Sequence, residues 1–77
     1  MEKVNAYVFI VVTVGREKKV LEEIKKINGI SEAMIVYGEY DIVARVTTSS
    51  LKELTQTVMK IRRINDVLRS ETLIFAI

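Results

Sequence analysis

The chain has 77 residues, of which 49% are hydrophobic, and its 12 basic and 10 acidic side chains leave a net charge of +2. This length predicts one domain, 1–77, and a single copy of that size buries only about 60% of its unfolded surface. Cysteine and histidine are absent, which excludes disulfides, thiol or imidazole catalysis and most zinc, copper, haem and iron–sulfur sites. We expect no cofactor and no catalytic residues.

The start of the chain has no signal for export or membrane insertion. Met1-Glu2-Lys3 is not a basic leader, and the apolar run after it ends at Gly15, well short of the roughly 20 residues of a membrane span. We therefore expect a cytoplasmic protein without membrane contact. The many Ile, Val, Lys and Glu residues are weakly typical of a heat-adapted organism.

Hydrophobic periodicity predicts six elements. In chain order they are a strand Val4–Val14, a helix Arg16–Asn28, a strand Ile30–Tyr37, a strand Tyr40–Thr47, a helix from Leu51 to about Arg63 and a strand Val67–Ile77, with a two-residue turn Gly38-Glu39 between the second and third strands. The helical spacing consists of Val20, Ile24 and Ile27 in the first helix, and Leu51, Leu54, Val58 and Ile61 in the second. Gly29 is a typical helix stop, and Ser50 with Glu53 predicts a capping box.

The two halves of the chain resemble each other. Ile27-Asn28-Gly29-Ile30 recurs 37 residues later as Ile64-Asn65-Asp66-Val67. Two βαβ halves joined by a hairpin predict an α+β, ferredoxin-like βαββαβ fold. Right-handed crossovers then place both helices on one face of a four-stranded antiparallel sheet, with the first and third strands in the middle.

The other face of this sheet is expected to be apolar and uncovered. Residues proposed for it are Tyr7, Phe9 and Val11 of the first strand and Leu73, Phe75 and Ile77 of the last. Leaving about six such side chains in water forgoes ~1.5 kcal/mol each, a sum that rivals the ~5–15 kcal/mol stability of a whole domain. We therefore expect a homodimer that packs sheet against sheet, as in a dimeric α+β barrel.

Gly38-Glu39-Tyr40-Asp41 is the one place where glycine, an aromatic ring and a carboxylate meet. A tight hairpin turn would explain these residues without any ligand. Alternatively, Asp41 could pair with an ammonium group while the turn amides receive a carboxylate. From the residues alone, both readings remain open.

Taken together, these segments resemble the C-terminal ligand-binding (RAM) domain of the Lrp/AsnC transcription regulators. The resemblance runs over nearly the whole chain, and it depends most on Gly38-x-Tyr40-Asp41 followed by Ser70-x-Thr72. It implies sheet-to-sheet dimers that assemble into rings, octamers or decamers, with a small amino acid bound between dimers. By resemblance, Gly38 and the Tyr40 backbone would meet the ligand carboxylate, Asp41 its ammonium, and Thr72 and Ser70 would add hydroxyl contacts.

The chain departs from full-length members because it opens directly on the first strand. Without a recognition helix we expect no direct DNA binding. The resemblance thus implies a stand-alone effector-binding and oligomerisation module, or a fragment of a regulator, which could associate with full-length Lrp/AsnC proteins. Two alternatives remain: a purely structural oligomer-forming module, and an enzyme limited to carboxylates, hydroxyls and lysines.

Overall fold

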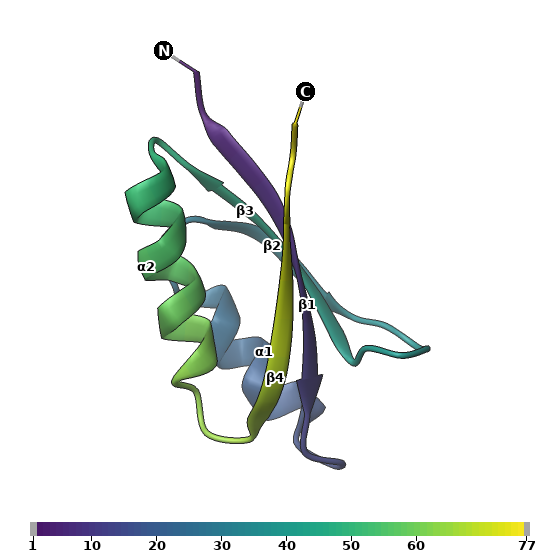
Figure 1. Cartoon of the computed structure of the whole chain (residues 1–77). Helices are drawn as coiled ribbons and strands as arrows, with labels where there is room; N and C mark the ends of the chain where they lie inside the picture. Colours follow the sequence, from purple (N-terminus) through teal and green to yellow (C-terminus); the bar gives the residue numbers. More distant parts are fainter. Residues whose placement is uncertain (1, 77) are drawn as a thin grey trace.

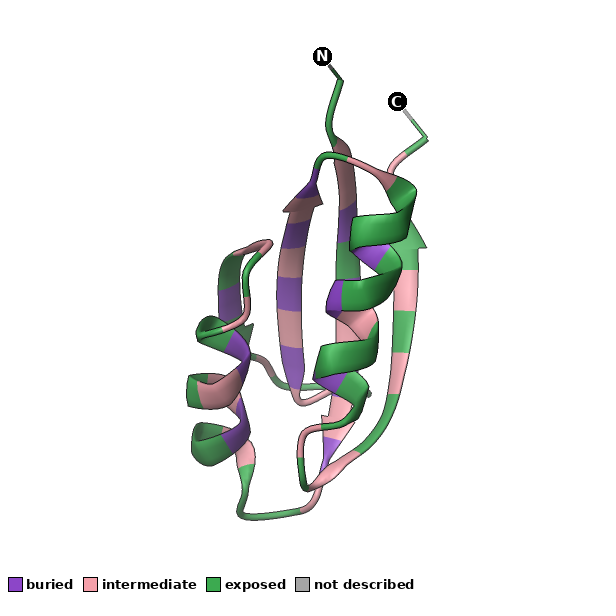
Figure 2. Cartoon of the chain, turned by 90° about the vertical axis from the view of Figure 1, so that its left-hand side faces the viewer, coloured by how far each residue is buried: buried purple, intermediate pink, exposed green. Residues whose placement is uncertain are grey.

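The computed structural model describes residues 2–76, which form a four-stranded antiparallel sheet covered on one side by two helices (Figures 1 and 2). The elements are β1 (Val4–Val12), α1 (Glu17–Lys25), β2 (Ile30–Ile35), β3 (Ile42–Thr48), α2 (Leu51–Arg62) and β4 (Val67–Ile74). The strand order is β2-β3-β1-β4. This confirms the predicted ferredoxin-like fold with β1 and β3 in the middle.

The core lies between the sheet and the helices because β1 and β3 alternate strictly. Ala6, Val8 and Ile10 of β1 are completely buried, whereas Tyr7 and Phe9 between them point to the face without helices. In β3 the buried residues are Ile42, Ala44, Val46 and Thr48. The helix layer contributes Val20 and Ile24 from α1 and Leu54, Thr57 and Ile61 from α2.

The helix signals in the sequence are mostly confirmed. Ser50 Oγ accepts a hydrogen bond from Glu53 N at 3.1 Å, as the capping box predicted, and Glu53 in turn accepts one from Ser49 N. The predicted inner stripe of α2 is wrong at one end, because Leu51 lies in the first turn and is 58% exposed. Thr57 is buried instead. Within residues 2–76, neither helix combines the length and hydrophobicity needed to cross a membrane.

Several predicted boundaries were too generous. β1 ends at Val12 and Val14 is 92% exposed, because the chain turns at Gly15, whose φ is +89°. The helix over 16–28 ends at Lys25, where it tightens into turns leading to Gly29. β4 ends at Ile74, although Phe75 N still donates to Asn5 O at 2.8 Å. Ile77, included in the predicted last strand, lies outside the described residues.

The internal repeat is visible in the backbone. Gly29 and its counterpart Asp66 both have positive φ, +99° and +77°, and the carbonyl of each accepts a hydrogen bond from a threonine amide. The strands that follow are also irregular at equivalent places. The pairing of β2 with β3 shifts register around Ser31, and that of β4 with β1 shifts around Leu68, again 37 residues apart. The two halves therefore share their helix-to-strand connection as well as their residue pattern.

Gly29 should be the glycine that tolerates replacement least. A Cβ at this position would lie 3.1 Å from Thr57 Oγ1 and 3.3 Å from Thr48 Cγ2, whereas one on Gly15 would meet nothing within 4 Å. Both positions have left-handed φ. We therefore expect Gly29→Ala to lower the free energy of unfolding by about 2 kcal/mol and Gly15→Ala by about 1 kcal/mol. Urea denaturation at one fixed protein concentration measures both, and equal losses would contradict the contact argument.

Candidate functional site

The connection between β2 and β3 is a wide loop over residues 36–41, and it projects beyond the body of the sheet (Figure 1). It is closed by a hydrogen bond from Val36 N to Asp41 O at 2.9 Å. The prediction of a two-residue turn at Gly38-Glu39, with a strand beginning at Tyr40, is therefore wrong. β3 begins only at Ile42. Tyr40 and Asp41, which precede it, both make contacts with β1.

Asp41 ties this loop to β1. Its backbone N donates to Ile10 O at 2.9 Å, and Val12 N donates to its carboxylate Oδ2, also at 2.9 Å. The side chain therefore replaces the ladder partner that β3 no longer supplies at this end of β1. Because only Oδ2 takes part in this bond, the other carboxylate oxygen can accept a hydrogen bond from a second donor.

Tyr40 is held on the uncovered face of the sheet. Its ring lies 5.2 Å from the ring of Phe9, and the Arg69 guanidinium stacks over it at 5.9 Å. Its hydroxyl donates to Glu71 Oε1, and this hydrogen bond is the main reason why the pKa of Tyr40 is raised above its ordinary value. The sequence analysis overlooked Arg69 and Glu71, since only the pairing of β1 with β4 brings them next to Tyr40.

The tip of the loop exposes its backbone amides. Within residues 2–76, the N–H groups of Gly38, Glu39 and Tyr40 make no backbone hydrogen bond. Gly38 has a φ of +132°, and a Cβ there would meet no atom within 4 Å. Three consecutive amides without backbone partners, followed directly in the chain by a carboxylate, offer groups for the negative and the positive end of a zwitterion.

Ser70 and Thr72 lie on the other face of the sheet from Tyr40. In the register of β4 they stand opposite Ile10 and Val8, which are buried under the helices. The two hydroxyls therefore share one face of the sheet. Thr72 lines a largely apolar groove of about 230 Å³ between α2 and β4. Within one chain the five predicted ligand-binding residues therefore do not converge on a single pocket.

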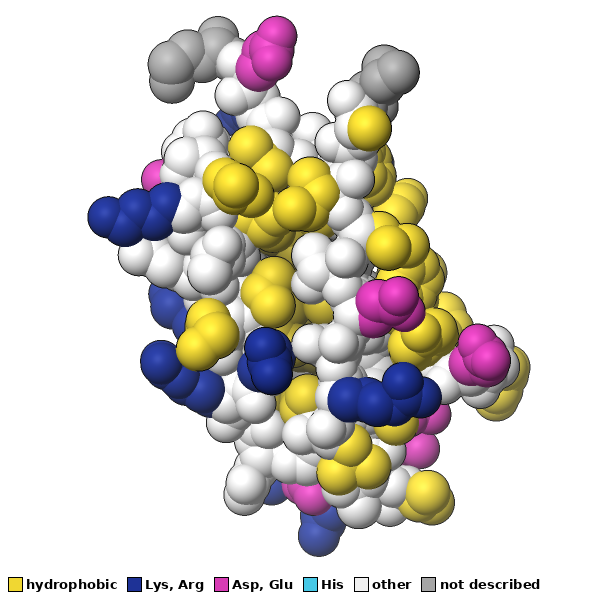
Figure 3. Space-filling view, viewed as in Figure 1, with side chains coloured by type: hydrophobic (Ala, Val, Ile, Leu, Met, Phe, Trp, Pro, Cys, Tyr) yellow, Lys and Arg dark blue, Asp and Glu magenta, His cyan; other side chains and the backbone are white. Residues whose placement is uncertain are grey.

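The uncovered face of the sheet carries a continuous aromatic strip. Tyr7 lies 6.3 Å from Phe9 and 5.2 Å from Phe75 between ring centroids, and the Arg45 guanidinium stacks over Phe75 at 5.4 Å. Leu73, which pairs with Tyr7, is 52% exposed. Figure 3 shows this face edge-on, and hydrophobic side chains gather along that side of the molecule. The residues predicted for this face, Tyr7, Phe9, Val11, Leu73 and Phe75, belong to it.

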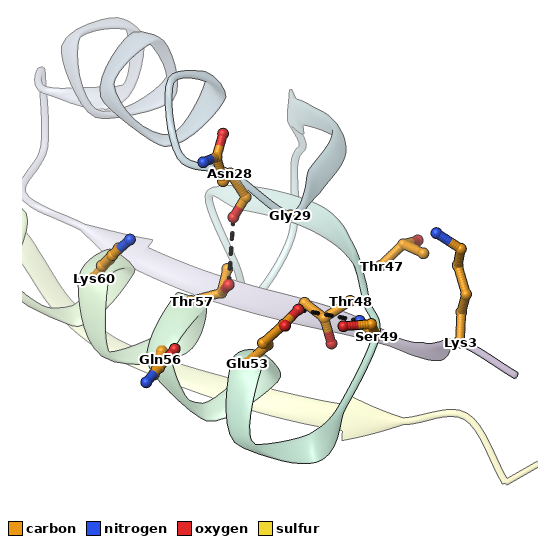
Figure 4. Close-up of a pocket in the computed structure, with 10 residues that line it drawn as sticks. All are labelled: Lys3, Asn28, Gly29, Thr47, Thr48, Ser49, Glu53, Gln56, Thr57 and Lys60. Atoms are coloured by element: carbon orange, nitrogen blue, oxygen red, sulfur yellow. Dashed lines mark hydrogen bonds between the residues drawn. The ribbon is translucent and has the colours of Figure 1, made fainter. Parts of the chain in front are cut away.

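A second candidate is a polar hollow of about 480 Å³ at the other end of β3 (Figure 4). It is lined by Lys3, Asn28, Gly29, Thr47, Thr48, Ser49, Glu53, Gln56, Thr57 and Lys60. The sequence analysis missed it, although a polar Thr57 inside the apolar stripe of α2 was a visible signal. No group of three or more acidic side chains suited to a metal ion occurs among residues 2–76.

Comparison with known proteins places this fold in a family. The sequence model described as the Lrp/AsnC ligand binding domain matches residues 5–76. The chain belongs to this family. It is a family of regulator ligand-binding domains and not one of enzymes.

Relatives of this Lrp/AsnC domain include whole regulators and short proteins. It is 37% identical over 59 residues to an uncharacterised HTH-type transcriptional regulator of Pyrococcus furiosus, covering 75% of this chain and 39% of that protein. It is 35% identical to the hypothetical protein PHS023 of Pyrococcus horikoshii, whose crystal structure superposes with a TM-score of 0.88 over 96% of this chain and 90% of that one. AsnC of E. coli shares the fold with a TM-score of 0.89 at 24% identity, over 96% of this chain and 51% of that one.

The role of the Asp41 carboxylate in holding the loop can be measured. Asp41→Ala leaves Val12 N without its acceptor, and we expect it to lower the free energy of unfolding by about 1–3 kcal/mol. Asp41→Asn keeps a side-chain oxygen for this bond and should cost less than about 1 kcal/mol. Glu39→Ala, at an exposed acid two residues away, is the control and should change little. Equal losses for the Ala and Asn variants in urea denaturation would contradict this role.

Proposed function

We propose that this Lrp/AsnC domain is an effector-binding and oligomerisation module that takes up a small amino acid at the loop over residues 36–41. The observation that carries the proposal is the loop tip, where the amides of Gly38, Glu39 and Tyr40 make no backbone hydrogen bond within residues 2–76 and Asp41 follows them directly in the chain. A ligand α-carboxylate would accept hydrogen bonds from these amides, and its ammonium would pair with Asp41. The plain-turn reading is less consistent with this loop, because a tight turn would use its amides internally.

In this proposal the ligand site is completed by a second copy of the chain. Ser70 and Thr72 cannot reach the uncovered face on which Tyr40 lies, since they stand on the helix side of the sheet. Because the loop over 36–41 projects beyond the sheet (Figure 1), it is free to approach β4 of a neighbouring molecule. A site between dimers would bring the hydroxyls of Ser70 and Thr72 to a ligand held by the neighbour's loop.

The dimer itself would form through the uncovered face of the sheet. The aromatic strip is flanked by Arg45 and Arg69 and by Glu32 and Glu71, which face the same side. A two-fold axis through this face would bury the strip and allow these opposite charges to pair across the interface. Contacts between such dimers would then give an octamer or decamer, and full-length Lrp/AsnC regulators could join the same assembly.

The ligand proposal is tested by calorimetric titration with each of the twenty standard amino acids. We expect at least one to bind with a sub-millimolar dissociation constant and Asp41→Asn to weaken that binding at least tenfold, because the variant keeps the Val12 hydrogen bond but loses the charge. Glu39→Gln removes the charge of a neighbouring side chain to which we assign no ligand contact. This variant should bind the amino acid nearly as tightly as the parent does. If no amino acid gives heat at millimolar concentration, the domain has another function.

The interface proposal is tested by light scattering on a matched pair of variants. Leu73→Glu places a charge on the aromatic strip, whereas Val14→Glu places one at a hydrophobic residue that is 92% exposed and outside that face. We expect the first to reduce the particle mass toward that of a single chain and the second to leave it unchanged. An unchanged mass for Leu73→Glu would show that the interface lies elsewhere.

A purely structural oligomer-forming module is the second candidate. It is favoured by the fact that Asp41 and Tyr40 already have partners within the chain, Val12 and Glu71. Such a module would assemble to the same mass with and without amino acids. Light scattering with an equimolar amino-acid mixture therefore distinguishes the two candidates.

A further inference from the structure

The polar hollow in Figure 4 lies at the opposite end of β3 from the loop over 36–41. Its floor includes Thr47 and Thr48 at the end of the strand, and its walls come from the start of β2 at Gly29 and from α2. Since β3 has seven residues, the two places are separated by about 20 Å. A ligand in the hollow would thus be distinct from one held by the loop.

The lining of the hollow is unusual for this chain. Almost half of the residues in the sequence are hydrophobic, yet none of the ten residues that line the hollow has an apolar side chain. Its volume of about 480 Å³ falls in the range of small-molecule sites. A site lined by polar and charged residues selects ligands chiefly through hydrogen bonds and charge.

The internal repeat singles out Thr57. Its counterpart 37 residues earlier is Val20, which has the same shape and is completely buried. Thr57 is 6% exposed, and its hydroxyl donates to Asn28 O at 3.3 Å. The fold accepts an apolar side chain at the equivalent place in the first half, so packing by itself does not require this hydroxyl. With its proton used internally, the Thr57 oxygen still offers lone pairs to a ligand donor.

Thr48, on the floor of the hollow, is also a buried threonine whose hydroxyl proton is bonded within the chain. It is 7% exposed, and its hydroxyl donates to Ser50 O at 2.9 Å. Glu53 adds a carboxylate whose pKa is lowered mainly by its hydrogen bonds from Ser49, so this group stays ionised at neutral pH. The interior of the hollow is therefore rich in acceptors that face a ligand.

Two ammonium groups flank these acceptors. Figure 4 draws Lys60 and Lys3 on opposite sides of the hollow, with Thr57 and Glu53 between them. The two lysines and Glu53 are the charged residues of the lining, which leaves it with one net positive charge. Acceptors in the middle and cations at the rim complement a molecule that carries hydroxyl groups and a negative charge.

We propose that this hollow binds a small hydroxyl-bearing anion, a phosphorylated or carboxylated polyol. Lys60 contacts its anionic group, and Lys3 lies on the opposite side of the hollow. The hydroxyls of the ligand donate to Thr57, Thr48 and Glu53. This second ligand site is separate from the amino-acid site proposed above and does not depend on it.

The binding is tested by two-dimensional ¹⁵N–¹H NMR titration of the whole chain with four probes. They are glycerol 3-phosphate, glycerate, inorganic phosphate and glycerol. We expect the amide signals of Gly29, Ser49 and Thr57 to shift with either hydroxyl-bearing anion, at least fivefold more tightly than with inorganic phosphate or glycerol. Glycerol 3-phosphate and glycerate distinguish a phosphorylated from a carboxylated ligand. If inorganic phosphate binds as tightly as glycerol 3-phosphate and glycerate do, the hollow is only a cationic surface and the proposal fails.

Variants test whether the hollow is a specific binding site or attracts anions only through the positive charge of the chain. We expect Lys60→Gln and Thr57→Val each to weaken binding about fivefold or more, while Lys25→Gln, at an exposed lysine of α1 outside the lining, changes it less than twofold. Thr57→Val has the shape of Val20 but loses the hydrogen bond to Asn28 O, so we expect it to stay folded with a melting temperature lowered by roughly 4–8 °C. Asp41→Asn should leave the titration unchanged. Equal weakening by Lys60→Gln and Lys25→Gln, or no effect of Thr57→Val, would overturn the proposal.

Discussion

The sheet is apolar on both faces while the helices cover only one of them, and this imbalance governs the rest of the molecule. Val8 and Ile10 enter the core, and Tyr7 and Phe9 of the same strand lie on the opposite side. Strict alternation in β1 makes this unavoidable, because side chains of a strand point to alternate faces. Both helices pack on one side since each βαβ crossover is right-handed. The aromatic strip is therefore a direct consequence of the topology.

The loop over 36–41 depends on that same central strand. Asp41 bonds Ile10 O and Val12 N of β1, and Tyr40 packs on Phe9. The side of the loop near the sheet is held, whereas the amides of its tip have no backbone partner among residues 2–76. One strand thus supports the core, the aromatic strip and the loop, so the proposed interface and the proposed ligand site are mechanically connected.

The internal repeat distinguishes features that both halves of the fold share from features that occur in one half alone. Gly29 and Asp66 share a backbone conformation, so the helix-to-strand connection belongs to the fold. Where the halves differ without a packing reason, as at Val20 and Thr57, a polar group has been placed in an otherwise apolar position. Thr57 lines a hollow whose ten lining residues include no apolar side chain. The proton of this hydroxyl is bonded to Asn28 O, so what Thr57 can offer a ligand is the lone pairs of its oxygen.

The sequence by itself determined the element order, the two-layer fold and the residues on each face of β1, because apolar periodicity and right-handed connections leave few alternatives. It also identified Gly38, Tyr40 and Asp41 as a distinctive corner, but it predicted a tight two-residue turn there instead of the open loop. Only the tertiary structure decided that, since the hydrogen bonds of Asp41 run to β1, about 30 residues earlier in the chain. In the same way, strand pairing alone placed Ser70 and Thr72 on the helix side and brought Glu71 to Tyr40. Long-range register has no local signature, because it arises from the packing of the whole sheet.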